Sequence, residues 1–358
     1  MPDRVFIIAE AGVNHDGSLA DALRMVDVAA EAGADAVKFQ TFTAEAALTP
    51  RAMKADYQVA NTGAGGSQLD MVRRLELPAS AHDALAERCR ERGIAFLSTA
   101  FDLDSLRLLQ RYDMPAVKIP SGDITWGEML LAAARTGRPL IVSTGMATLE
   151  EVREALAVIA FGLVRPGWPR DAAATLEAFG TPAGQAALRE RVTLLHCTTQ
   201  YPAPPEAVNL RAMATLGRTF GLPVGYSDHT LGLTIPIAAA AMGPRVIEKH
   251  FTHDRPPVGP DHAASLTPAE LAAMVRAVRE VEVALGSEKK VPSAVEIPNR
   301  FVARRSLVAA GPIAAGEPFA PANLTAKRPA DGLSPLRQWE LTGRPAGRPY
   351  ACDEAIEE

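Results

Sequence analysis

The sequence predicts a (β/α)8 barrel followed by a small β-rich domain. Eight short runs of β-branched and apolar residues alternate with stretches rich in Ala, Leu, Arg and Glu that have a helical period. These units occupy about 285 residues, which is the size of such a barrel. Each run also ends in, or is closely followed by, polar side chains, as barrel strands do at their catalytic face.

The eight predicted strands are short, and several are rich in valine and isoleucine. They lie at Val5–Ala9, Ala36–Phe39, Ala95–Thr99, Ala116–Ile119, Leu140–Thr144, Val192–Cys197, Val224–Ser227 and Val246–Lys249. A doubly wound open sheet would show the same alternation. Because no G-x-G-x-x-G motif follows the first run, the dinucleotide-binding version of that sheet is not favoured.

Several predicted helices begin at residues that cap a helix N-terminus, and some end at glycine. The helices lie at Ser18–Ala32, Ser80–Arg92, Asp104–Tyr112, Leu149–Ile159, Pro205–Leu216 and Thr267–Leu285, with expected N-caps at Ser18, Ser80, Asp104 and Thr148. Two insertions interrupt the alternation. The segment Thr43–Pro78 is predicted to be a long functional loop. The segment Phe161–Glu190 precedes the sixth strand, is expected at the opposite end of the barrel, and is assigned no chemistry.

The composition of the sequence changes after residue 285. Residues 286–300 are polar, contain two prolines and are predicted to form a linker. Short apolar pieces and turns follow, which indicates a small β-rich domain over 301–358. The predicted organisation is therefore a catalytic barrel at 1–285, a linker and a second domain.

Composition excludes several classes of protein. The 358 residues carry a formal net charge of -5 that is not gathered into blocks, which argues against nucleic acid as a partner. Cys89, Cys197 and Cys352 are too few and too widely spaced for a disulfide framework. The apolar run Val5–Ala9 is too short for a signal peptide, and Leu231–Met242 cannot span a bilayer. We expect a cytoplasmic protein without a membrane partner.

Cations and hydroxyls gather at the predicted strand ends. Lys38 and Lys118 lie inside strand segments, where a charge is costly unless it is paired. Together with the hydroxyls of Thr99, Ser121 and Ser227, these lysines can hold a phosphate and a carboxylate. The alternative for each lysine is a side chain that reaches out to the barrel rim.

Two histidines end neighbouring strands, at His229 and His250. Such a pair can share a divalent metal ion and leave positions open for water or substrate. The alternative is a pair of hydrogen-bonded structural histidines. His196, within an apolar strand, is expected to be a satisfied core residue, and His82 is expected at the surface.

Two carboxylates, Glu10 and Asp261, are candidates for acid/base chemistry or sugar binding. For Glu10 the alternative is a structural salt bridge to Lys38. A Schiff-base aldolase is also possible, because Lys38, Lys118 and Lys249 are all strand lysines. The two histidines favour the metal route.

Long motifs in a fixed order resemble the bacterial sialic acid synthase family, which includes legionaminic and pseudaminic acid synthases. They are IAEAGVNHDG (8–17), GADAVKFQTF (33–42), VKIPSGD (117–123), STGM (143–146), LLHCTTQYPAPPE (194–206), GYSDHT (225–230), EKHFT (248–252) and GPDHAAS (259–265). The motifs RRSLVAA (304–310) and AKRPADG (326–332) resemble the antifreeze-like SAF domain of the same enzymes, a β-clip fold. The neuraminic and legionaminic branch is the more similar one.

The resemblance implies a role for each matching position. It implies catalytic roles for Glu10, Lys38 and Lys118; a phosphoenolpyruvate site of Lys38, Thr99, Lys118, Ser121, Thr199 and Ser227; a sugar site of Gln40, Asn61, Asp123, Tyr201, Asp261 and Arg328; and metal ligands His229 and His250. The implied ion is Mn2+, with Mg2+ or Co2+ as alternatives. Asp123 stands where many members have glutamate, and Thr199 where some have asparagine.

The resemblance also implies a reaction and an assembly. Phosphoenolpyruvate and N-acetylmannosamine would give a sialic acid and phosphate. The alternative acceptor is 2,4-diacetamido-2,4,6-trideoxymannose, which gives legionaminic acid. A domain-swapped homodimer is implied, with Arg328 reaching the partner subunit's site to recognise the N-acyl group. Two rival hypotheses are a deoxy-sugar-phosphate synthase and a sugar-binding protein that has lost catalysis.

Overall fold

The computed structural model describes residues 4–63, 65–253 and 259–357, and the chain divides into two compact units, Met1–Gly286 and Ser287–Glu358. The first unit is a closed barrel of parallel strands in the order β1 to β8, as predicted. The strands are β1 (Phe6–Gly12), β2 (Ala36–Thr41), β3 (Ala95–Ala100), β4 (Val117–Ile119), β5 (Leu140–Ser143), β6 (Val192–Cys197), β7 (Val224–Asp228) and β8 (Val246–His250).

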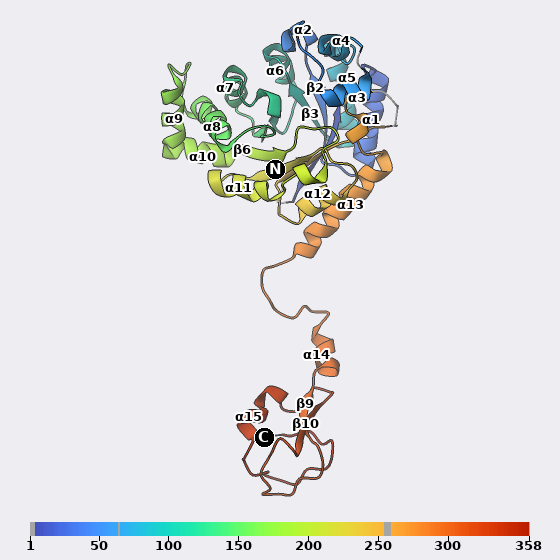
Figure 1. Ribbon diagram of the computed structural model, residues 1–358, viewed down its shortest axis with the longest axis vertical. Coiled ribbons are helices and arrows are strands. Elements are labelled where there is room, and N and C mark those ends of the chain that lie inside the picture. Colours follow the sequence, from blue (N-terminus) through green and yellow to red (C-terminus); the bar gives the residue numbers. More distant parts are fainter. Residues whose placement is uncertain (1–3, 64, 254–258, 358) are drawn as a thin grey trace. The chain divides into compact units, whose positions relative to one another are not determined.

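Helices follow the strands and surround the barrel (Figure 1). They are α1 (Leu19–Glu31), α5 (Ala79–Arg92), α6 (Leu103–Leu109), α7 (Gly127–Arg135), α8 (Leu149–Val164), α11 (Arg211–Phe220), α12 (Thr234–Ala240) and α13 (Pro268–Leu285), with short 3-10 turns η1 (Ser121–Asp123), η2 (Pro205–Ala207) and η3 (His262–Ala264). The single helix predicted at Pro205–Leu216 is wrong. Asn209, at a positive φ of 50°, separates η2 from α11. No helix in the described part of the chain is long and apolar enough to cross a membrane.

Two of the four predicted N-caps are correct and two are wrong. Ser18 and Thr148 accept hydrogen bonds from the first turns of α1 and α8, whereas Ser80 and Asp104 lie inside helices. Asp102 caps α6, because its carboxylate accepts the backbone N–H of Ser105 at 2.7 Å. Pro78 precedes α5 in an extended conformation, so that helix begins one residue earlier than Ser80.

Both insertions are helical. The segment Thr43–Pro78, predicted as a loop, contains α2 (Ala44–Ala47), α3 (Asp56–Thr62) and α4 (Gln68–Arg73). The helix α4 begins with a capping box formed by Ser67 and Asp70, a local signal that the loop prediction did not use. The segment Phe161–Glu190 contains the end of α8, α9 (Ala172–Gly180) and most of α10 (Pro182–Arg191).

Strand register decides which side chains face the barrel interior. Glu10 pairs in register with Lys38 of β2 on one side and with His250 of β8 on the other. A β-bulge between Glu10 and Gly12 ends the regular pairing. Because side chains alternate along a strand, Lys249 points away from the barrel interior. On the outer side of the strand its ammonium lies 2.6 Å from the Asp228 carboxylate.

The second unit is small and β-containing, as predicted. Its antiparallel pair is β9 (Ser306–Ala309) and β10 (Leu324–Lys327), with α14 (Ile297–Ala303), η4 (Pro335–Arg337) and α15 (Gln338–Leu341). It has its own apolar core, which includes Leu307, Phe319 and Tyr350. The predicted linker at 286–300 overlaps the first residues of α14.

Candidate active site

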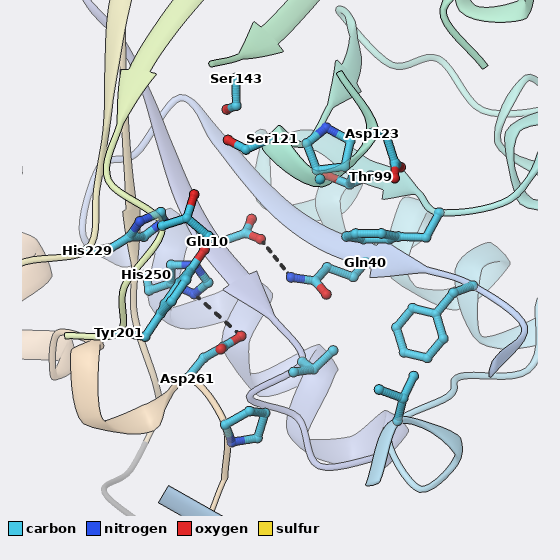
Figure 2. A pocket seen from close by; sticks show the side chains of 18 of the residues that line it. Glu10, Gln40, Thr99, Ser121, Asp123, Ser143, Tyr201, His229, His250 and Asp261 are labelled. Atoms are coloured by element: carbon cyan, nitrogen blue, oxygen red, sulfur yellow. Dashed lines mark hydrogen bonds and ion pairs between the residues drawn. The ribbon is translucent and has the colours of Figure 1, made fainter. Parts of the chain in front are cut away.

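A cavity of about 420 Å³ opens among the strand ends of the first unit, and all eight strands contribute to its lining. The structure brings together every predicted site residue of the barrel except Asn61: Glu10, Lys38, Gln40, Thr99, Lys118, Ser121, Asp123, Thr199, Tyr201, Ser227, His229, His250 and Asp261. Figure 2 shows ten of the lining side chains by name. Polar side chains at the strand ends therefore form one site.

Two lysines and two glutamates form a buried charge cluster at the base of this cavity. Lys38 Nζ lies 2.7 Å from Glu10 Oε2 and 3.5 Å from Glu248 Oε2, and Lys118 Nζ lies 3.5 Å from Glu248 Oε1. All four side chains are at most 5% exposed. The salt bridge considered for Glu10 is thus present, within the site itself. Lys38 also donates to Thr99 Oγ1 at 3.1 Å.

The two carboxylates of the cluster differ in acidity. Burial raises the pKa of Glu10 to about 7, against the opposing charge of Lys38. Burial would also raise the pKa of Glu248, but the charges of Lys118 and Lys38 lower it to about 2. Glu248 is therefore ionised, whereas Glu10 can gain or lose a proton near neutral pH.

Glu248 is a site residue that the sequence predictions omitted. It accepts a hydrogen bond from Ser227 Oγ at 2.8 Å and contacts both site lysines. A usable signal was present, since Glu248 lies two residues before His250 in the same strand and must share its face. The same rule places Lys249 on the opposite face, which leaves it outside the cavity lining.

Hydroxyl groups gather on the β4, β5 and β6 side of the cavity. Ser143 Oγ and Thr199 Oγ1 are buried and have no hydrogen-bond partner among the described residues. Ser121 Oγ accepts from Gly145 N at 2.9 Å and lies 3.1 Å from Cys197 Sγ. A Cβ at Gly145 would come within 2.4 Å of Thr199 Oγ1. Only glycine fits at position 145, and the hydroxyls beside it lie on the cavity wall, where they suit an oxyanion.

The two predicted metal ligands are neutral and adjacent. Burial lowers the pKa of His229 to about 4 and that of His250 well below its ordinary value. His229 Nδ1 lies 2.6 Å from Thr198 O and donates to it, which leaves Nε2 with its lone pair. His250 Nδ1 is buried without a partner in the described structure, and the two ring centroids are 5.5 Å apart.

This arrangement fits a divalent ion held by two protein ligands. A neutral imidazole is a common ligand for metal ions, and the carboxylate of Asp261 lies 4.0 Å from His250 Nδ1. No group of three or more His, Cys, Asp or Glu among the described residues could hold a metal. Water or substrate would therefore complete the coordination.

Aromatic rings connect the histidines to the insertion. Tyr201 packs on His229 with ring centroids 4.1 Å apart, and Tyr57 stacks on Tyr201 at 5.0 Å. Tyr57, from α3, lines the cavity and was not predicted, because nothing in the spacing of an insertion indicates which side chain turns inward. Gly12, at a positive φ of 54°, leaves room here: a Cβ would lie 3.3 Å from His250 Cε1 and 3.4 Å from Asp261 Oδ2.

Two predicted site residues, Asn61 and Arg328, lie outside the cavity. Asn61 Nδ2 donates to Pro260 O at 2.8 Å and does not line the cavity, and Arg328 is an exposed residue of the second unit. The surface prediction for His82 is wrong, since His82 is buried and its Nε2 lies 2.8 Å from Thr41 Oγ1. His196 is hydrogen-bonded to Val208 O at 2.6 Å, as expected for a satisfied residue.

Asp123 carries a buried carboxylate oxygen that has no hydrogen-bond partner in the described part of the chain, and this predicts a pH effect on stability. Burial raises the pKa of Asp123 to about 6, against the charge of Lys118. Below pH ~4 the carboxyl is neutral in both states. Between pH ~4 and ~6 only the unfolded chain ionises it, so the free energy of unfolding falls by about 1–3 kcal/mol and stays lower above that range.

Asp123→Asn removes this titration, so the variant is expected to lose less stability than the wild type between pH 4 and pH 7. Urea unfolding at both pH values measures the difference. Asp113→Asn, at an exposed position, is the control and should behave as the wild type does. An unchanged pH dependence in Asp123→Asn would contradict the prediction.

Known proteins resemble the chain over nearly its full length. Residues 25–290 match the NeuB family and residues 304–349 match the SAF domain. The N,N'-diacetyllegionaminic acid synthase of Campylobacter jejuni is 45% identical over 99% of both chains, and that of Legionella pneumophila is 43% identical over 94% of this chain and 89% of the relative.

A solved structure of a related synthetase is also similar to this chain. The N-acetylneuraminic acid synthetase of Leptospira borgpetersenii, in complex with citrate, superposes with a TM-score of 0.66 at 34% identity, covering 83% of this chain and 90% of the other. Family matches to both parts of the chain and relatives above 40% identity lead to one conclusion. The chain belongs to the NeuB family and carries a SAF domain.

Proposed function

We propose that this enzyme condenses phosphoenolpyruvate with an N-acylated amino sugar of the mannose type and water, giving a nonulosonic acid and phosphate. The observation that carries the proposal is the cavity itself. Two buried lysines and unpartnered hydroxyls lie in the same cavity as two neutral histidines and a glutamate that titrates near pH 7. Anion binding, metal binding and proton transfer are thus possible within one site.

The proposed acceptor is 2,4-diacetamido-2,4,6-trideoxymannose, and the product is then N,N'-diacetyllegionaminic acid. Two relatives that are 45% and 43% identical to the chain bear the name of that synthase. N-acetylmannosamine is the second candidate, supported by the N-acetylneuraminic acid synthetase whose structure is similar.

The chain's own residues would hold phosphoenolpyruvate as an anion. Lys38 and Lys118 would offset its charge, and the hydroxyls of Ser143 and Thr199, which have no partner among the described residues, would donate to its oxygens. Glu248, ionised between the lysines, favours the charged form of both ammonium groups and helps to hold them in place. Because these groups are fixed before substrate arrives, little reorganisation is needed during the reaction.

Bond formation would join carbon 3 of phosphoenolpyruvate to the aldehyde carbon of the open-chain sugar. Water then adds at carbon 2, and phosphate leaves as the carbonyl forms. His229 and His250 would hold a divalent ion, proposed to be Mn2+, which supplies Lewis acidity toward the aldehyde oxygen. Glu10, with a pKa of about 7, would accept or donate the proton that moves during these steps.

Phosphate release from phosphoenolpyruvate tests the proposal directly. With Mn2+ and the diacetamido sugar, we expect one phosphate and one nonulosonic acid, seen by mass spectrometry, for each phosphoenolpyruvate consumed. A Schiff-base aldolase would instead give a lysine adduct after borohydride treatment with substrate. Such an adduct would overturn the proposal, and so would sugar binding without phosphate release.

Arg328 is proposed to reach the site of a partner subunit in a domain-swapped homodimer and to bind the N-acyl carbonyl oxygen. Arg328→Ala should then raise the Michaelis constant for the sugar about 10-fold, because one charge-assisted hydrogen bond is lost, and leave that for phosphoenolpyruvate unchanged. Steady-state kinetics measure both constants. Lys327→Ala removes a neighbouring cation that pairs with Asp353 and serves as the control.

Mixed dimers test whether Arg328 acts across subunits. At low sugar concentration the Arg328→Ala homodimer should keep about a tenth of the wild-type activity and the Lys38→Met homodimer almost none, but a mixed dimer has one site in which both residues are intact. Random mixing should restore about a quarter of the wild-type activity. If mixing restores none, Arg328 does not act in the partner subunit's site.

A further inference from the structure

The insertion between β2 and α5 lines one part of the cavity with apolar side chains. Phe42, Leu48, Met71, Val72 and Leu75, together with Phe101 after β3, form what we call the apolar wall. We propose that this wall sets acceptor choice by receiving the deoxygenated and acylated end of the sugar. The inference rests on the proposed function and assigns its sugar specificity to named residues of one segment.

Charge is distributed unevenly around the cavity. The lining carboxylates and lysines, and both histidines, come from strand ends or from the loops that follow strands outside the insertion. None of the lining residues in the described parts of the insertion (43–63 and 65–78) is charged. In Figure 2, Glu10, His229 and His250 lie together, and Asp123 lies across the cavity from them. We therefore infer that the aldehyde group of the sugar binds beside Glu10 and the two histidines.

The apolar wall is a packed surface and not a set of loose side chains. The rings of Phe42 and Phe101 meet edge to face, with centroids 6.2 Å apart and an interplanar angle of 82°. Met71 and Leu75 are only 6% and 9% exposed. Val72 is half-buried and lines the cavity from α4. A substrate group that touches this wall meets carbon and sulfur atoms.

The polar side chains that the insertion brings to the cavity are partly engaged with each other. Gln68 Nε2 donates to Gln58 Oε1 at 3.3 Å, and the same oxygen accepts from Ala55 N at 3.0 Å. Tyr57 stacks on Tyr201, which in turn packs on His229. The insertion is thus joined by ring contacts to the reacting end of the site.

The chemistry of the wall favours a methyl group over a hydroxymethyl group. A hydroxyl placed against apolar side chains loses its hydrogen bonds to water and gains none, whereas a methyl group is itself better removed from water. A sugar whose aldehyde lies at the catalytic end directs its far carbons away from that end. Deoxygenation at carbon 6 and an acetamido methyl group suit the wall, and the expected preference is about 10- to 100-fold in kcat/KM.

Two sugars that differ at one oxygen test this inference: 2,4-diacetamido-2,4,6-trideoxymannose and its 6-hydroxy analogue. The full-length enzyme is assayed with both, as wild type and as Val72→Thr, which adds a hydroxyl to the wall without a change of size. Val59→Thr is the matched control, because Val59 is a half-buried valine of the same insertion that does not line the cavity. Calorimetric titration with the reduced open-chain alcohols measures the preference without turnover.

The wild type should prefer the 6-deoxy sugar, Val72→Thr should lower that preference about 5- to 10-fold, and Val59→Thr should leave it unchanged. If phosphate is released with both sugars and the preference is absent or equal in all three proteins, the wall does not set acceptor choice, although the proposed function stands. If neither alcohol binds and no phosphate is released, the proposed function itself fails and the inference fails with it.

Discussion

Replacing Lys38 with methionine is expected to lower kcat/KM for phosphoenolpyruvate by at least about 1000-fold, because we propose that Lys38 combines anion binding with charge stabilisation in a water-poor site. Its ammonium contacts Glu10 at 2.7 Å and Glu248 at 3.5 Å, and the whole group is buried. Methionine has a similar length and no charge, so the variant tests the charge. Phosphate release at saturating sugar measures the effect.

The matched control for Lys38 is Lys249, another buried strand lysine. Its partner is Asp228 at 2.6 Å, and it lies outside the cavity lining. Lys249→Met is expected to destabilise the fold by about 3–5 kcal/mol, since it leaves a buried carboxylate unpaired. The fraction that stays folded should keep its Michaelis constant for phosphoenolpyruvate. The proposed role of Lys38 is wrong if Lys38→Met retains more than a tenth of wild-type kcat/KM.

Chelation of divalent ions by EDTA is expected to abolish phosphate release, and added Mn2+ should restore it. His250→Gln should lower activity at least about 100-fold even with excess Mn2+, because the proposed ion would lose one of only two protein ligands. Electron paramagnetic resonance of free Mn2+ measures binding independently of activity. Tight binding in the wild type and weakened binding in His250→Gln are the expected results.

His196→Gln is the control for His250→Gln. His196 is bonded to Val208 O at 2.6 Å and does not line the cavity, so its loss should leave Mn2+ binding unchanged. Activity that persists in EDTA would show that His229 and His250 do not act as ligands of a required metal ion. Equal Mn2+ affinity in the wild type and in His250→Gln would also contradict the proposed role of His250 as a metal ligand.

The strand predictions succeeded because the signal is local. Each strand is a short apolar run, and in a closed parallel barrel the polar residues that end such runs must meet at one face. The same geometry brings Glu10, Lys38, Lys118 and His250 into one cavity. It did not require knowledge of how far apart their atoms lie.

The incorrect or missing predictions for Glu248, Tyr57 and His82 also have physical reasons. Glu248 was omitted although side-chain alternation in β8 places it beside His250, so a rule was available and was not applied. Tyr57 could not be found in this way, because the insertion's helices are short and their facing depends on tertiary contacts such as the stack on Tyr201. His82 is buried, and its ring nitrogens form hydrogen bonds with Thr41 and Pro78. The local sequence indicates neither partner.

The pairing of β1 with β8 has a consequence for how the molecule comes to be active. Glu10 and His250 are opposite one another in register, although nearly the whole barrel sequence lies between them. Contacts of such high sequence separation form late and slow folding, because the chain must first lose the entropy of a long loop. A growing chain on the ribosome therefore cannot assemble this site until its eighth strand has emerged, and a barrel left open at that seam would keep Glu10 beside Lys38 but would not bring it to His250.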